Sequence, residues 1–171
     1  PTRAVNKVRE RQHDACVFSG DAEEPLYGTT YLPRKFKCAV TVPGDNSVDL
    51  LTQDIGLVAF ADANGALRGC NVYVGGGMGR THNKEETFAR TADALGYVDA
   101  EHVLDLVQAI LALQRDYGDR QNRRHSRMKY LIHDQGIAWF KQELKAKYFA
   151  HPIKGMPLEP KPKLPDHLGW D

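Results

Sequence analysis

The fold is decided by two short apolar runs, Gly56-Leu57-Val58-Ala59-Phe60-Ala61 and Leu67-Arg68-Gly69-Cys70-Asn71-Val72-Tyr73-Val74. Both have the length of a strand, and both carry β-branched and aromatic residues. Between them stands Asn64-Gly65, a dipeptide typical of the tight turn in a β-hairpin. We therefore expect an antiparallel hairpin whose second strand leads into a glycine loop, Gly75-Gly76-Gly77-Met78-Gly79.

A strand that carries two lysines is expected upstream, over residues 31–42. Because side chains alternate along a strand, Lys35 and Lys37 should project to one side. The apolar residues of the stretch should then point into a core: Phe36, Cys38, Val40 and Val42. Two ammonium groups held side by side repel each other unless an anion lies between them. The pattern favours a site for a small dianion, and the alternative is an edge strand whose lysines discourage aggregation.

Helices are expected after the glycine loop. Asn83 and Glu86 form a capping-box pattern that predicts a helix to about Leu95. Asp99 is the expected cap of a second helix, which ends at Gly118. Two further helical regions are expected over 121–134 and 137–148. Strands followed by helices predict the α+β class, with a small, mainly antiparallel sheet and a helical segment packed on it.

The chain has 171 residues, 42% of them apolar, which suits one domain with an ample core. Residues 1–25 are polar and predict an N-terminal arm, and residues 26–150 make up the α+β domain. Residues 151–171 are rich in proline, which predicts a linker leading to a further domain. Because the chain begins with Pro1 rather than Met, we expect it to be the central piece of a longer protein.

Composition excludes several classes of protein. A net charge of +1 argues against a general nucleic-acid or membrane binder, and no apolar run is long enough to span a membrane. Cys16, Cys38 and Cys70 are widely spaced and odd in number, which indicates reduced thiols in a cytoplasmic protein. The seven histidines show no spacing typical of metal ligands, so no metal site is predicted.

Two further stretches are suited to anions. In the glycine loop, backbone N–H groups could approach a ligand closely, and the alternative is an ordinary strand-to-helix turn. Further on, five cations stand within ten residues: Arg120, Arg123, Arg124, Arg127 and Lys129. On a helix, the pairs 120/124 and 123/127 would each cost roughly 0.2–0.5 kcal/mol by repulsion, and an anionic cofactor edge would reverse that cost. The alternative is a solvated basic face or a helix that contacts RNA.

Several blocks, in this order and spacing, resemble the sirohaem-dependent assimilatory sulfite and nitrite reductases. They are Leu32-Pro33-Arg34-Lys35-Phe36-Lys37, Val74-Gly75-Gly76-Gly77-Met78-Gly79-Arg80-Thr81-His82, Gln114-Arg115-Asp116 and the stretch 120–130. The resemblance runs from about Glu24 to Phe149. The segments 43–49 and 77–82 look most like the ferredoxin-dependent, plant and cyanobacterial type.

The resemblance implies a function for the parent protein and roles for individual residues. Sulfite reductases of this family carry out the six-electron reduction of sulfite to sulfide at a sirohaem coupled to a 4Fe–4S cluster. Lys35 and Lys37 match the catalytic, substrate-contacting lysines. The residues that match cofactor-binding segments are Gly75, Gly76, Gly77, Gly79, Arg80, Thr81, His82, Arg123, Arg124, Arg127 and Lys129.

The resemblance also implies partners. These are sulfite, ferredoxin as electron donor and the remaining domains of the parent chain, with no nucleic acid and no membrane. The cluster cysteines of the family lie beyond this chain, so the isolated fragment should be inactive.

Lys37 separates two members of the family. In plant-type nitrite reductases a neutral asparagine stands in its place, and nitrite carries one charge fewer than the sulfite dianion. Lys37 therefore favours sulfite. A nitrite reductase segment stays open as an alternative, as does a non-catalytic module that binds anions, tetrapyrrole or RNA.

Overall fold

The computed structural model describes residues 25–159 of the chain. The chain divides into two compact units, residues 1–31 and residues 32–171. In the described part of the first unit, residues 25–30 form a turn, and the Tyr31 N–H donates to the Tyr27 carbonyl oxygen at 3.1 Å.

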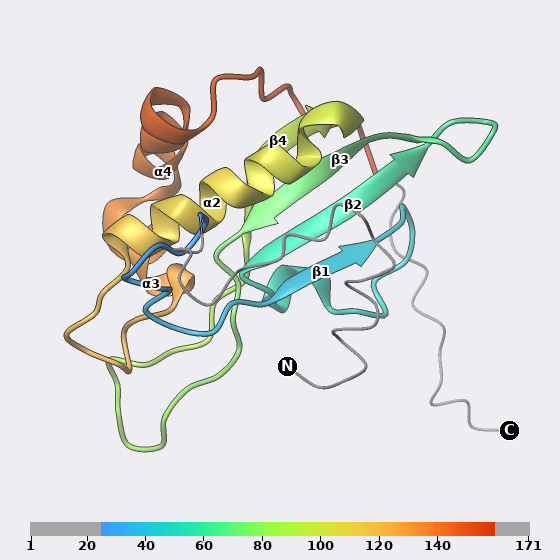
Figure 1. Cartoon of the computed structure of the whole chain (residues 1–171). Helices are drawn as coiled ribbons and strands as arrows, with labels where there is room; N and C mark the ends of the chain where they lie inside the picture. Colours follow the sequence, from blue (N-terminus) through green and yellow to red (C-terminus); the bar gives the residue numbers. More distant parts are fainter. Residues whose placement is uncertain (1–24, 160–171) are drawn as a thin grey trace, which may run out of the picture. The chain divides into compact units, whose positions relative to one another are not determined.

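The second unit contains a sheet of four strands in the order β1-β2-β3-β4 (Figure 1). The strands are β1 (Cys38–Thr41), β2 (Ile55–Ala61), β3 (Leu67–Val74) and β4 (Asp93–Asp99). β1 runs parallel to β2, whereas the pairs β2–β3 and β3–β4 are antiparallel. The predicted hairpin and the α+β class with a mainly antiparallel sheet are therefore confirmed.

Short and long helices surround the sheet. They are η1 (Leu50–Thr52), η2 (Ala100–His102), α2 (Val103–Tyr117), α3 (Met128–Gln135), α4 (Ile137–Glu143) and the π-helical η3 (Leu144–Tyr148). α2 crosses one face of the sheet (Figure 1), and its side chains Leu106, Ile110 and Leu113 join the main core cluster. Among residues 25–159, no helix combines the length and the apolar character needed to cross a membrane.

The lysine-bearing strand is shorter than expected. Only residues 38–41 form β1, and Lys35 and Lys37 precede it in irregular backbone. The prediction that Cys38, Val40 and Val42 point into the core is wrong, because Cys38 is exposed and the two valines are 57% and 56% exposed. The reason is that β1 is one edge strand of the sheet, whereas α2 packs near β4 at the opposite edge.

The predicted helix over 83–95 does not form. Residues 81–88 make turns, and the chain then enters β4, where Leu95 and Val98 are buried. Asn83 adopts a left-handed φ of 54°, and the Thr87 hydroxyl donates to the Lys84 carbonyl oxygen at 2.9 Å. Pairing with the free edge of β3 and this local hydroxyl bond outweigh the capping-box signal.

The basic stretch is also less helical than predicted. α3 begins at Met128, and the Asp119 carboxylate before it accepts the N–H groups of Gln121 and Asn122 at 2.8 and 2.9 Å. Such side-chain bonds compete with helix formation. The pairs 120/124 and 123/127 are therefore not helical neighbours, and the repulsion argument based on a helix is wrong.

The segment after η3 packs against the sheet over residues 151–159, which belong to the predicted linker. Tyr97 and Lys154 exchange backbone hydrogen bonds of 2.9 and 2.8 Å at the edge of β4. Asn71 and Tyr73 of β3 donate to the Glu159 carboxylate at 2.5 and 2.8 Å. Residues 160–171 lie outside the described part of the chain.

The packing of α2 yields a matched pair of substitutions. Ile110 is fully buried, whereas Leu104 on the same helix is 73% exposed. Ile110→Ala should lower the free energy of unfolding by about 2–5 kcal/mol, because it leaves a cavity in the core. Leu104→Ala should change it by less than about 0.5 kcal/mol. Urea titration of both variants measures the difference, and similar midpoints would contradict the packing described here.

Candidate functional site

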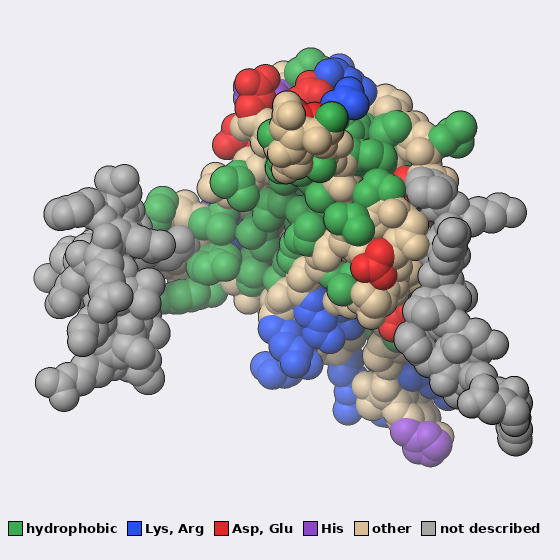
Figure 2. Space-filling view, turned by 90° about the vertical axis from the view of Figure 1, so that its right-hand side faces the viewer, with side chains coloured by type: hydrophobic (Ala, Val, Ile, Leu, Met, Phe, Trp, Pro, Cys, Tyr) green, Lys and Arg blue, Asp and Glu red, His purple; other side chains and the backbone are tan. Residues whose placement is uncertain are grey.

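A cavity of about 530 Å³ opens beside the glycine loop, and we call it the basic pocket. Its lining residues are Arg34, Lys35, Lys37, Gly79, Arg80, Thr81, Thr87, Arg123, Arg124, Arg127 and Tyr130. Seven of these eleven residues are Lys or Arg, and none is acidic. Figure 2 shows Lys and Arg side chains gathered at the lower part of the molecular face, next to an area of apolar side chains.

Lys35 and Lys37 line the same pocket although no strand fixes them. Phe36 between them packs against the core, so the alternation expected of a strand is kept at these three residues. Within residues 25–159, Lys35, Lys37 and Arg80 form no ion pair. Exposed ammonium and guanidinium groups that lie side by side in one cavity attract anions.

Asp54 connects the walls of this pocket. Its buried carboxylate accepts the Lys37 backbone N–H at 3.0 Å and pairs with the Arg127 guanidinium at 3.1 Å. Its carbonyl oxygen accepts the Gly75 N–H at 2.9 Å. Burial raises the pKa of Asp54 above its ordinary value, and the Arg127 charge acts in the opposite direction.

In the glycine loop, the backbone N–H groups of three glycines are already hydrogen-bonded within the protein. What the glycines provide is room for a neighbouring side chain to approach the backbone closely. The N–H groups of Gly75, Gly76 and Gly77 donate to the backbone carbonyls of Asp54, Gln53 and Arg90 at 2.7–2.9 Å. An amide nest that points these three groups at a ligand is therefore not formed. A Cβ added at Gly77 would lie 2.8 Å from the Arg127 guanidinium, so the missing side chain makes room for that arginine.

Lys129 supports the loop from inside. Its buried ammonium donates to the carbonyl oxygens of Gly77 at 3.1 Å, Gly79 at 2.7 Å and Phe88. Burial, together with the nearby Arg127 charge, lowers the pKa of Lys129 to about 8. The group still carries its charge at pH 7, and three N–H donors meet three acceptors.

The structure brings most of the predicted site residues together. Eight of them line the basic pocket: Lys35, Lys37, Gly79, Arg80, Thr81, Arg123, Arg124 and Arg127. The other five do not line the cavity: Gly75, Gly76, Gly77, His82 and Lys129. Lys129 contacts the lining residue Gly79 through a hydrogen bond, whereas His82 is exposed.

Sequence reasoning missed Arg34, Thr87, Tyr130 and Asp54. Arg34 stands within the stretch 32–37 and could have been included. Tyr130 likewise ends the stretch 120–130 and could have been included. Asp54 and Thr87 carry no local signal, because the contacts of Asp54 reach across the fold and the hydrogen bonds of Thr87 belong to turns that the sequence did not predict.

Comparison with known proteins assigns the family. A family model described as "Nitrite and sulphite reductase 4Fe-4S domain" matches residues 6–153. The chain belongs to this family. The resemblance to the sirohaem-dependent reductases predicted from sequence is thereby confirmed.

Individual relatives agree with this assignment. The chain is 62% identical over 155 residues to "Sulfite reductase [ferredoxin]" of Synechococcus elongatus, covering 88% of this chain and 24% of the relative. It is 43% identical over 174 residues to the "Sulfite reductase [NADPH] hemoprotein beta-component" of Shewanella putrefaciens, covering 99% of this chain and 30% of that protein. The solved structure of the Mycobacterium tuberculosis NirA protein matches with a TM-score of 0.65 and 30% identity, over 80% of this chain and 23% of NirA. The chain thus spans less than a third of the length of these relatives.

The thiols of this chain do not suffice for the cluster in the family's description. A 4Fe–4S cluster takes four thiolate ligands, and the whole sequence holds three cysteines. Of the two in the described part, Cys70 is buried in the core, and burial raises the pKa of its thiol. Three thiols cannot supply the four ligands of such a cluster.

The contacts of Lys129 give a second prediction. Lys129→Met keeps the length of the side chain but leaves three carbonyl oxygens without their donor, so the free energy of unfolding should fall by about 2–4 kcal/mol. The control Lys141→Met changes an exposed lysine on α4 and should cost less than about 0.5 kcal/mol. Urea titration measures both, and equal stability of the two variants would show that Lys129 does not hold the loop.

Proposed function

We propose that this chain is the segment of a sulfite reductase that holds sulfite beside sirohaem, with Lys35 and Lys37 as the groups that contact the substrate. The observation that carries this proposal is the basic pocket, which gathers seven cations and no acid in one cavity. Such a concentration of charge is unfavourable in the empty pocket and favourable around an anion with several charges.

The chemistry of sulfite reduction suits the two lysines. Sulfite is a dianion, and its conversion to sulfide removes three oxygens and consumes protons. Lys35 and Lys37 attract the anion by Coulomb force, and each can donate a proton to an oxygen that leaves. When bound, sirohaem coupled to a 4Fe–4S cluster supplies the electrons.

The arginines of the pocket suit the carboxylates of sirohaem. A guanidinium presents a planar fork that can grip both oxygens of a carboxylate, which a lysine cannot do. Arg80, Arg123 and Arg124 line the pocket from two separate segments, and Arg34 approaches from a third. The Asp54 carboxylate partly neutralises Arg127, so we assign two roles to Arg127. It holds the pocket wall in place, and it contributes to binding of the cofactor.

The remaining expectations concern the parent protein. The relative that is 62% identical is named for ferredoxin, which supports ferredoxin as electron donor. We assign the cluster ligands to the remaining domains of the parent chain, because this chain has too few thiols. A cytoplasmic location stays a prediction.

A nitrite reductase segment is the second candidate, since the family's description covers both substrates. Lys37 is the residue that favours sulfite, because it adds a second charge for a dianion beside Lys35. The RNA-binding alternative loses its main support, because residues 119–127 form turns instead of the basic helix on which it rested.

A chimaera tests the proposal. The matching segment of the Synechococcus elongatus enzyme is replaced by this chain, with and without Lys37→Asn. Losing one charge-assisted contact should reduce kcat/KM for sulfite about 10- to 150-fold. The kcat/KM for nitrite should fall by a smaller factor, because nitrite carries one charge fewer. Steady-state assays with both substrates measure the ratio.

Lys141→Asn is the control for the chimaera, because Lys141 is exposed on α4 and does not line the basic pocket. It should leave both activities unchanged. If Lys37→Asn leaves the preference for sulfite unchanged, the assignment of Lys37 fails.

The isolated chain distinguishes a cofactor segment from an RNA-binding module. We expect sirohaem to bind the chain with a shift of its Soret band, and Arg123→Ala to weaken this binding. RNA binding with a steep dependence on salt, combined with no uptake of sirohaem, would favour the RNA-binding alternative.

A further inference from the structure

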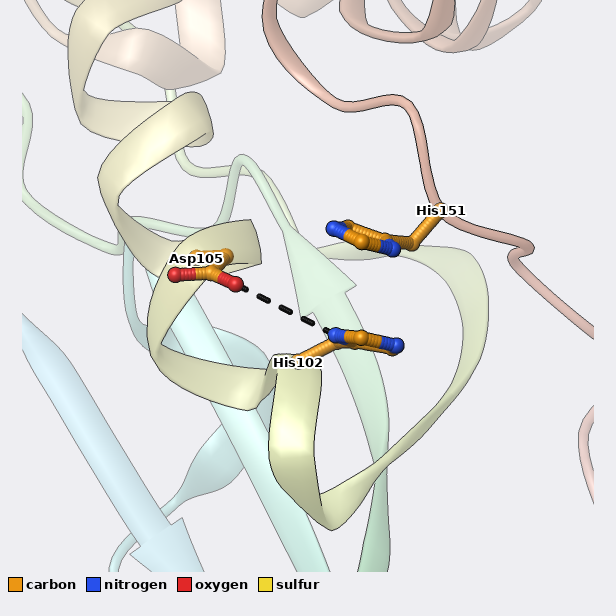
Figure 3. A group of neighbouring side chains, drawn as sticks. All are labelled: His102, Asp105 and His151. Carbon is orange, nitrogen blue, oxygen red and sulfur yellow. Dashed lines mark ion pairs between the residues drawn. The ribbon is translucent and has the colours of Figure 1, made fainter.

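Three side chains with metal-binding atoms meet outside the basic pocket (Figure 3). His102 ends η2, Asp105 lies on the first turn of α2, and His151 comes from the segment after η3. One ligand atom from each of the three lies within 4.8 Å of the others. His102 and Asp105 are three positions apart, so the helix places them on one face, and the fold alone brings His151 to them.

The two histidine rings are already in contact. Their centroids lie 3.7 Å apart with an angle of 16° between the planes, and Figure 3 shows the His151 ring lying over the His102 ring. His102 is partly buried, whereas Asp105 and His151 are exposed. Exposed side chains can turn toward a ligand without disturbing the core.

The surroundings of His102 favour a metal on one of its two nitrogens. Its Nε2 lies 3.3 Å from the Glu101 carboxylate, and its Nδ1 lies 3.9 Å from Asp105 Oδ2. In a neutral ring, a proton on Nε2, the nitrogen nearer to Glu101, would leave the lone pair on Nδ1, the nitrogen nearer to Asp105. A histidine that binds metal through one nitrogen and a carboxylate through the other is the usual arrangement at metal sites in proteins.

We propose that His102, Asp105 and His151 bind one divalent transition-metal ion of the zinc class, and that Glu101 orients His102 for it. Two imidazoles and one carboxylate are a donor set that Zn²⁺ prefers, and water completes the coordination. Sequence spacing gave no sign of this site, because His102 and His151 are far apart along the chain and only two of the seven histidines take part.

Binding requires a small rearrangement. Donor atoms bound to a tetrahedral zinc at about 2.0–2.1 Å lie about 3.3 Å from one another. In this structure the three ligand atoms lie within 4.8 Å of one another, so they must move closer together. Parallel rings also direct their lone pairs along parallel lines, so the stack must open. Rotation of the exposed His151 ring about its side-chain bonds achieves both changes, while Glu101 keeps His102 in place.

A bound ion would fasten two parts of the fold to each other. His151 lies between Phe149, which is buried in the core, and Lys154, whose backbone pairs with Tyr97 and whose side chain pairs with Asp99 at 2.5 Å. The ion would therefore clamp this segment onto the start of α2. The expected result is a rise in stability that depends on metal concentration.

The test uses the whole chain without an affinity tag, freed of metal by a chelator, and Zn²⁺ as the probe. Calorimetry should show one ion per chain. At about 100 times the dissociation constant, Zn²⁺ should raise the melting temperature by about 5–10 °C, and a chelator should reverse the rise. No binding up to millimolar zinc would overturn the proposal.

Variants identify the ligands. His151→Gln and His102→Gln should each weaken zinc binding by more than about 100-fold, and Glu101→Gln should weaken it by about 10- to 100-fold. His133→Gln, which changes an exposed histidine on α3, is the matched control and should leave the affinity unchanged. Equal affinity in all four variants would overturn the assignment.

Spectroscopy separates this site from binding by the thiols. With Co²⁺ in place of Zn²⁺, the spectrum should lack the ultraviolet band of a cobalt–thiolate bond. Imidazole ¹⁵N resonances of His102 and His151 should shift, and those of His133 should stay in place. A strong thiolate band at one equivalent of metal would assign the ion to cysteine and reject the proposal.

Discussion

The ion pair and hydrogen bonds of Asp54 hold the basic pocket in one geometry. Its carboxylate fixes the backbone at Lys37 and the guanidinium of Arg127, and its carbonyl oxygen fixes Gly75. Three segments that are far apart in the sequence thus meet at one residue. The buried negative charge also offsets part of the repulsion among the lining cations, which is about 3 kcal/mol for two unit charges 6 Å apart at an effective dielectric constant of 20.

Two groups of cations around the pocket have different tasks. Arg127 and Lys129 are turned toward the protein, where a carboxylate and backbone carbonyls use their charge to shape the glycine loop. Lys35, Lys37 and Arg80 form no ion pair within residues 25–159 and are exposed along the cavity. The inward group fixes the geometry and the outward group supplies the field, so the pocket can be rigid and strongly positive at once.

Sequence reasoning succeeded where local patterns agree with the final packing. The hairpin of β2 and β3 follows from two apolar runs around Asn64-Gly65, and α2 follows from one apolar stripe. The helix expected over 83–95 was wrong, because its residues pair with β3 or form turns through Thr87. Most residues that line the basic pocket were expected from motif and charge, whereas Asp54 was missed because its contacts reach residue 127, 73 positions away. No local pattern encodes that distance.

The strength of the basic pocket depends on what surrounds it. Its lysines are exposed in this chain, so water screens their field, and the same charges act several-fold more strongly in a low-dielectric interior. Val40 of β1 and Val42, which follows the strand, are also exposed at the edge of the sheet. An exposed apolar edge strand promotes aggregation of an isolated protein, and the same strand is suited to an interface with another domain. If further domains of the parent protein proposed above cover this surface, they also exclude water from the cations. High affinity for an anion would then belong to the assembled protein, whereas the position of each charge is set by this chain.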